Sequence, residues 1–131
     1  MASIRKEITV RATPDQAWAA LADLGALHTR LVPGFVVDTR LEPGARIVTF
    51  ANGVVARERI VSVDPAARRV VWSATGERLS HHNGSAQVTV GADSKTRVVW
   101  IADLLPDDAA GAIDQMMTHG MAAMQAALDR L

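Results

Sequence analysis

The chain has 131 residues, of which 49% are hydrophobic and 21% are charged, as expected for a globular domain large enough to have its own core. Its 14 basic and 14 acidic residues cancel, so the composition indicates no nucleic-acid partner and no attraction to an anionic membrane. It has no cysteine, which excludes disulfides, thiolate metal sites and a cysteine nucleophile. Because no apolar run resembles a signal peptide or reaches membrane-spanning length, we expect a cytoplasmic protein that does not insert into membranes.

The chain is predicted to begin with a strand and two short helices. Residues 3–11 alternate apolar and polar side chains, the pattern of a half-buried strand. Thr13, Pro14 and Gln16 then form a capping box with proline at the first helical position, so a helix is predicted to begin at Pro14. A second short helix is predicted over residues 26–31, before a proline–glycine turn.

The middle of the chain predicts only strands and turns. The strand segments are separated by turn signals, of which Asn52-Gly53 is the strongest indicator of a hairpin. The six predicted strands cover residues 35–41, 46–51, 54–63, 69–75, 85–90 and 96–104. No linker or internal repeat interrupts this order, so residues 1–131 are predicted to form a single domain.

The C-terminal segment predicts one long amphipathic helix over residues 108–131, with Asp107 as its N-cap and a length of roughly 35 Å. Its apolar stripe consists of Ile113, Met117, Gly120, Met121, Met124, Leu128 and Leu131. Methionine suits irregular spaces and surfaces that accept varied apolar partners, although ordinary core packing is the alternative. Gly120 indicates either close backbone approach or space left for a ligand.

This order of elements predicts an α+β fold. A seven-stranded antiparallel sheet twists and curls, and a single long helix laid in the curl would bury its concave face. One helix does not fill the curl completely, so we expect a cavity with the two short helices at one end.

The order of elements resembles the helix-grip fold of the START-like, or SRPBCC, superfamily. That superfamily includes polyketide cyclases and dehydrases, the birch-pollen allergen family and the plant abscisic acid receptors. The segment from Thr13 to Trp18 looks like the opening of the bacterial polyketide-cyclase-type members. The resemblance covers the whole chain and implies a ligand cavity, but it does not specify an activity, because the superfold hosts binding proteins and enzymes alike.

A closer similarity, to the abscisic acid receptors, is carried by Glu58-Arg59-Ile60, Arg68-Arg69-Val70 and Gly76-Glu77-Arg78-Leu79. It implies that Asn52-Gly53-Val54-Val55 is a gate loop, that Gly76-Glu77-Arg78-Leu79 is a latch loop, and that Glu58 is a cavity carboxylate. The gate proline, the latch histidine and the pocket lysine of those receptors have no counterpart here. The resemblance therefore implies the pocket but not the hormone-receptor role.

Three polar residues, Glu58 and the adjacent His81 and His82, are candidates for chemistry. Glu58 shares a strand face with Ala56 and Ile60, so it enters the cavity if that face is concave and pairs with an outer-face arginine if it is not. His81 and His82 are adjacent, so they point to opposite faces and cannot chelate one ion together. The sequence does not decide which of them faces the cavity, and exposed loop positions are the preferred interpretation. We expect no metal and no cofactor.

The last strand divides into two faces. Trp100 belongs to an apolar row on the concave face, whereas Asp103 is expected to be solvated. Val99 and Ile101 would be apolar residues on the outer face and could support a dimer contact, so the protein is expected to be a monomer or a weak homodimer. His28 and His119 are predicted to be surface residues.

These placements predict one ligand site between the sheet and the helix, with Glu58 as its polar anchor and with Asn52-Gly53 and Gly76-Glu77-Arg78-Leu79 at its mouth. Its residues are Phe50, Glu58, Trp72, Leu79, His82, Trp100, Met117, Met121 and Met124.

Two functions are compatible with such a site. The first is a carrier or sensor that binds a small hydrophobic or amphipathic molecule, such as a polyketide, an aromatic metabolite or a lipid. The second is a polyketide cyclase or dehydratase in which Glu58 and a histidine such as His82 move protons at an enolisable carbon. An enzyme needs at least two titratable groups that converge in the cavity, whereas a carrier needs one polar anchor. A partner-binding module would need an exposed apolar groove, which the sequence neither supports nor excludes.

Overall fold

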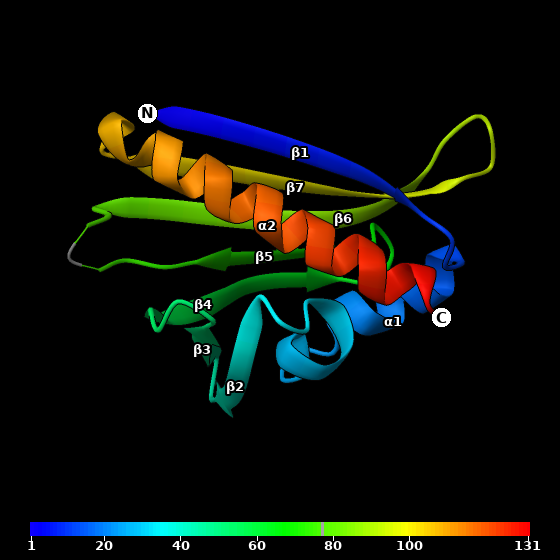
Figure 1. Cartoon of the computed structure of the whole chain (residues 1–131), viewed down its shortest axis with the longest axis horizontal. Coiled ribbons are helices and arrows are strands. Elements are labelled where there is room, and N and C mark those ends of the chain that lie inside the picture. The colour runs from blue at the N-terminus through cyan, green and yellow to red at the C-terminus, as the bar shows by residue number, and fades with distance from the viewer. Residues whose placement is uncertain (77) are drawn as a thin grey trace.

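The computed structural model describes residues 1–76 and 78–131. It confirms the predicted order of one strand, two short helices, six strands and a long helix (Figure 1). The elements are β1 (Ala2–Val10), α1 (Pro14–Ala22), η1 (Leu27–Leu31), β2 (Val36–Glu42), β3 (Ala45–Phe50), β4 (Val55–Asp64), β5 (Arg69–Ser73), β6 (His81–Val90), β7 (Thr96–Leu105), η2 (Asp107–Ala109) and α2 (Ala110–Asp129).

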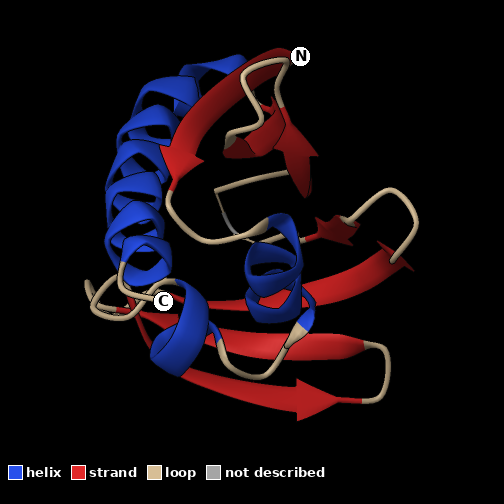
Figure 2. Cartoon of the chain, turned by 90° about the vertical axis from the view of Figure 1, so that its right-hand side faces the viewer, coloured by secondary structure: helices blue, strands red, loops and turns tan. Residues whose placement is uncertain are grey.

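The seven strands form one antiparallel sheet in the order β1-β7-β6-β5-β4-β3-β2. Strands β2 to β7 follow one another as a meander, and β1 joins its far edge by pairing with β7 from Ala2↔Leu104 to Val10↔Thr96. The sheet curls, and α2 lies diagonally across its concave side (Figures 1 and 2). The helix-grip α+β fold is therefore confirmed.

The first helix begins where the capping box predicts. The Thr13 hydroxyl accepts a hydrogen bond from the Gln16 backbone N–H at 3.1 Å, and the Gln16 side chain accepts one from the Thr13 N–H at 2.9 Å. The second predicted helix is a single π-helical turn, Leu27–Leu31. Leu27 and Leu31 of this turn and Leu21 of α1 are buried in the core.

The C-terminal helix begins later than predicted. Residues Asp107–Ala109 form a 3₁₀ turn, and α2 has 20 residues, Ala110–Asp129. Asp107 is not its N-cap, because Ala109 occupies that position without a side-chain cap. The aspartate instead pairs with the N-terminal amine at 3.1 Å. The stripe is buried at Met117, Gly120, Met121, Met124 and Leu128, whereas Leu131 is exposed.

Side-chain hydrogen bonds connect α2 to β1. The Lys6 ammonium lies 2.7 Å from the Asp114 carboxylate, and the Gln125 side chain donates to the Thr9 carbonyl at 3.0 Å. Near the C-terminal end of α2, Asp129 accepts from the backbone N–H of Arg11 at 2.8 Å. No helix in the described part of the chain has the length and apolar character needed to cross a bilayer.

The outer face of β7 is less open than predicted. Val99 is 9% exposed, and Ile101 and Asp103 are half-buried. Val99 therefore offers little surface for a dimer contact.

Candidate functional site

An internal cavity of about 70 Å³ lies between the concave face of the sheet, α2 and the η1 region. Its walls are mostly aliphatic and aromatic side chains, which are contributed by α1, η1, the strands β2 to β7 and α2. The lining residues with polar side-chain atoms are Arg46, Glu58, His82, Trp72 and Trp100. This mixture of an apolar wall with a few polar groups is typical of small-molecule sites.

Six of the nine predicted site residues line this cavity, namely Phe50, Glu58, Trp72, His82, Trp100 and Met124. Met117 and Met121 are buried in the core but do not line it, and Met116 lines it instead. Leu79 is half-buried against the core and is also absent from the cavity wall. Among the methionines of the apolar stripe of α2, only Met124 therefore lines the cavity.

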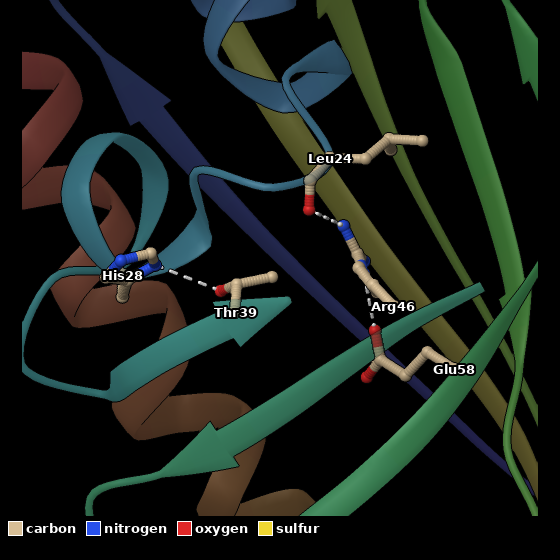
Figure 3. Close-up of polar contacts among 5 residues, drawn as sticks. All are labelled: Leu24, His28, Thr39, Arg46 and Glu58. Atoms are coloured by element: carbon tan, nitrogen blue, oxygen red, sulfur yellow. Dashed lines mark hydrogen bonds and ion pairs between the residues drawn. The ribbon is translucent and has the colours of Figure 1, made fainter. Parts of the chain in front are cut away.

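Glu58 faces the cavity and forms a buried ion pair with Arg46. The Arg46 Nε donates to Glu58 Oε1 at 2.8 Å, and the two residues are 4% and 9% exposed (Figure 3). The guanidinium also donates to the Leu24 carbonyl at 3.4 Å and lies 5.5 Å from the ring of Trp72. Arg46 was not predicted, although it has the same strand parity as Phe50, which was.

His82, and not His81, points into the cavity. β6 begins at His81 rather than at residue 85, so the two histidines lie in a strand and not in an exposed loop as preferred from the sequence. His82 is 8% exposed. Its burial, with a smaller contribution from the charge of His81, lowers the pKa of His82 below its ordinary value, so the imidazole is neutral at pH 7.

Two of the residues that line the cavity each carry a buried nitrogen atom without a partner. Neither the Nδ1 of His82 nor the Nε1 of Trp100 has a hydrogen-bond partner among the described residues. An unsatisfied buried polar atom costs about 1–3 kcal/mol. Such atoms in a native core therefore require an explanation, and a role in binding is one.

The two cavity tryptophans each lie against a glycine. A Cβ on Gly84 would lie 2.5 Å from the Trp72 ring, and one on Gly120 would lie 2.7 Å from the Trp100 ring. The two rings are 6.3 Å apart at a tilt of 53°. Of the two interpretations of Gly120, close approach is the one that the geometry supports, because Trp100 occupies the space that a side chain would need.

Arg46, Glu58 and His82 follow one another across the concave face. Arg46 is the register partner of Glu58, and Arg59 is that of Ser73, which places Glu58 opposite Ala74. Ala74 in turn donates its N–H to the His82 carbonyl at 3.0 Å. Glu58 and His82 are therefore two strand spacings apart, roughly 10 Å between their backbones.

A second, open hollow of about 520 Å³ lies outside the cavity, between the β3–β4 turn, the segment before β2 and α2. Phe35, Phe50 and Met116 line both hollows and separate them. The two phenylalanine rings meet edge to face, with centroids 5.4 Å apart. The outer hollow, which we call the entrance groove, is thus one layer of side chains away from the cavity.

In the described part of the chain, only one of the two loops predicted to form the mouth of the site lines the entrance groove. Asn52 lines it, as does the exposed His119 of α2. Gly76 and Leu79 are not found among the described residues that line either hollow, and Glu77 lies outside the described residues. The latch position of this second loop therefore stays a prediction.

His28 is half-buried rather than a surface residue. Its Nδ1 lies 3.2 Å from the hydroxyl of Thr39 on β2, which joins η1 to the sheet edge (Figure 3). Within residues 1–76 and 78–131, no three histidine, aspartate or glutamate side chains are grouped so that they could hold a metal ion.

The curled sheet, the long C-terminal helix and the cavity between them define a helix-grip protein of the SRPBCC class. Residues 1–131 match the family described as polyketide cyclase / dehydrase and lipid transport, and the chain belongs to that family. No curated protein matches the sequence.

Solved structures share the fold at low sequence identity. Protein XoxI from Bacillus cereus is 19% identical, with a TM-score of 0.86 over 98% of this chain and 96% of that one. BexL, a di-domain ARO/CYC protein from the BE-7585A biosynthetic pathway, is 19% identical with a TM-score of 0.80, and the match covers 98% of this chain and 47% of BexL. Norcoclaurine synthase from a Thalictrum species is 19% identical, with a TM-score of 0.69 over 98% and 92%.

Proposed function

We propose that this protein binds a small hydrophobic or amphipathic molecule in the internal cavity and acts as a carrier or sensor. The observation that carries the proposal is the pair of unpartnered nitrogen atoms, His82 Nδ1 and Trp100 Nε1, on residues of a mostly apolar wall. A bound molecule with polar atoms would satisfy them and so recover the cost of their burial. The family, described as polyketide cyclase / dehydrase and lipid transport, supports the same class of ligand.

The ligand would occupy both hollows. The cavity alone, about 70 Å³, holds little more than ordered water. Displacement of the Phe35, Phe50 and Met116 side chains would join it to the entrance groove of about 520 Å³, which reaches the usual size of a small-molecule site. Among the described residues, the side-chain hydrogen bonds that hold α2 go to β1 and to Arg11 directly after it, so the entrance side of the helix is the side that is free to separate.

Uptake of the neutral dye N-phenyl-1-naphthylamine tests this proposal. Ala86 lines the cavity and is 2% exposed, so Ala86→Leu should fill the cavity and lower dye affinity at least tenfold. Ala122 on the exposed face of α2 provides the matched control, because Ala122→Leu adds the same atoms without entering the cavity. If the wild-type protein takes up no dye, or if both variants bind it equally, the cavity is not the binding site.

A second candidate function is proton-transfer catalysis of the cyclase or dehydratase type. It is favoured by the placement of two titratable side chains, Glu58 and His82, in one cross-sheet row of the cavity. The neutral His82 imidazole would act as the base at an enolisable carbon, while the Glu58 carboxylate stays paired with Arg46.

Hydrogen–deuterium exchange at the α-carbon of 2-tetralone tests this second candidate. The protein should accelerate loss of the α-proton signal in deuterated water, and His82→Gln should abolish the acceleration while 2-tetralone still binds. If exchange is no faster than in buffer, or if His82→Gln leaves it unchanged, His82 is not a base.

A further inference from the structure

The charges in the cavity wall cancel one another. Arg46 and Glu58 are the charged residues that line the cavity in the described part of the chain, and they are paired with each other at 2.8 Å. The Arg46 guanidinium also contacts the Leu24 carbonyl and the Trp72 ring. Since burial keeps His82 neutral at pH 7, the wall has no spare charge with which to pair an ionic ligand.

A charged ligand would therefore lose its hydration without gaining a counter-ion. Transfer of an unpaired carboxylate or ammonium into a low-dielectric interior costs several kcal/mol. An uncharged ligand does not pay this cost.

The unpartnered nitrogen atoms specify what such a ligand needs. The Trp100 Nε1–H is a donor only, so it requires an acceptor. The His82 Nδ1 accepts or donates according to its tautomer, so it accommodates either a hydroxyl or a carbonyl. Oxygen on an aromatic or alicyclic skeleton matches both the acceptor requirement and the apolar wall.

Building on the proposed function, we propose that the ligand is an uncharged, oxygen-bearing apolar molecule, such as a phenol, ketone or quinone, whose oxygen accepts a hydrogen bond from the Trp100 indole. Anionic and cationic molecules of the same shape are discriminated against. Trp100 is thus a specificity-determining residue, and its ring is held in place by the close approach of Gly120.

Three probes with one naphthalene skeleton test this inference: 2-naphthol, 2-methylnaphthalene and 2-naphthoate. Titrations followed by indole ¹H–¹⁵N spectra report on all three tryptophans of the chain at once. We expect 2-naphthol to bind about three- to tenfold more tightly than 2-methylnaphthalene, as one hydrogen bond allows, and 2-naphthoate to bind more weakly than 2-naphthol. The Trp100 indole signal should move with 2-naphthol, whereas that of Trp18, which does not line the cavity, should not.

Trp100→Phe removes the donor and keeps an aromatic ring, so it should equalise the affinities for 2-naphthol and 2-methylnaphthalene. Trp18→Phe is the matched control and should preserve the difference. If Trp100→Phe does not fold, the wild-type Trp100 signal and the ranking of the three probes still decide the question. Equal binding of 2-naphthol and 2-methylnaphthalene, or tighter binding of 2-naphthoate, would refute the inference and leave the proposed function standing. Failure of both uncharged probes to bind would refute both.

Discussion

Removal of the Glu58 charge should destabilise the protein far more than an ion pair of the same geometry on the surface. Glu58→Gln preserves the shape of the side chain but leaves the Arg46 guanidinium, which is 4% exposed, without a counter-charge. Removal of one partner of a buried pair costs about 3–5 kcal/mol. For a chain of this length, that lowers the unfolding midpoint by about 10 °C or more.

The chain contains a matched control for this experiment. Arg57 Nε donates to Glu42 Oε1 at 2.9 Å, with the same atoms and almost the same distance as in the Arg46–Glu58 pair, but the two side chains are 53% and 42% exposed. Exposed pairs contribute about 0–1 kcal/mol. Glu42→Gln should therefore shift the midpoint by less than about 4 °C.

Thermal and urea unfolding, followed by far-UV circular dichroism, measure both variants. The double variant Arg46→Met/Glu58→Leu should recover most of the stability that Glu58→Gln loses, because it leaves no buried charge unpaired. Equal effects of Glu58→Gln and Glu42→Gln would refute the reasoning. So would a double variant that is as unstable as the single one.

Three further predictions concern other contacts. Gly84→Ala should displace Trp72, change the near-UV circular dichroism and cost about 1–3 kcal/mol, whereas Gly111→Ala, at a helical position with open space, should be neutral or stabilising. The lowered pKa of His82 means that the unfolded chain binds a proton that the native protein excludes, so stability should fall as the pH falls below 6.5, and His82→Gln should flatten this part of the profile. Thr13→Ala should cost about 1 kcal/mol through loss of the capping box, and Thr13→Ser should restore most of it.

Each of these predictions has a contradicting result. For the glycines it is equal stability changes in the two alanine variants. For His82 it is an unchanged dependence of the free energy of unfolding on pH, measured by urea titration from about pH 7.5 to about pH 5. For the cap it is a Thr13→Ala variant with wild-type stability in the same assay.

Most of the fold is predictable from the sequence because its local signals agree with one another. The capping box locates the first residue of α1, Asn52-Gly53 locates the β3–β4 turn, and parity places Trp100 on the concave face. These features depend on residues close together in the chain, which is why spacing alone reveals them.

The site is less predictable because long-range contacts decide its details. The start of β6 has little apolar alternation, and His81 and His82 become part of a strand through pairing with Leu105 and Leu104 of β7. The sequence alone gives no sign that Arg46 is buried. Its role becomes clear only when β3 and β4 pair and place it opposite Glu58. Met116 faces the cavity because of the angle at which α2 crosses the sheet. The spacing of apolar residues along a helix does not predict that angle.

Intermolecular nuclear Overhauser effects to methionine methyl groups test the central claim most directly. With all five methionines ¹³C-methyl-labelled and 2-naphthol bound, cross-peaks from the ligand ring should appear at Met116 and Met124, which line the cavity. None should appear at the exposed Met1. Cross-peaks at Met1 without any at Met116 or Met124, or bound ligand with no methionine cross-peaks at all, would place the ligand outside the cavity and contradict the account.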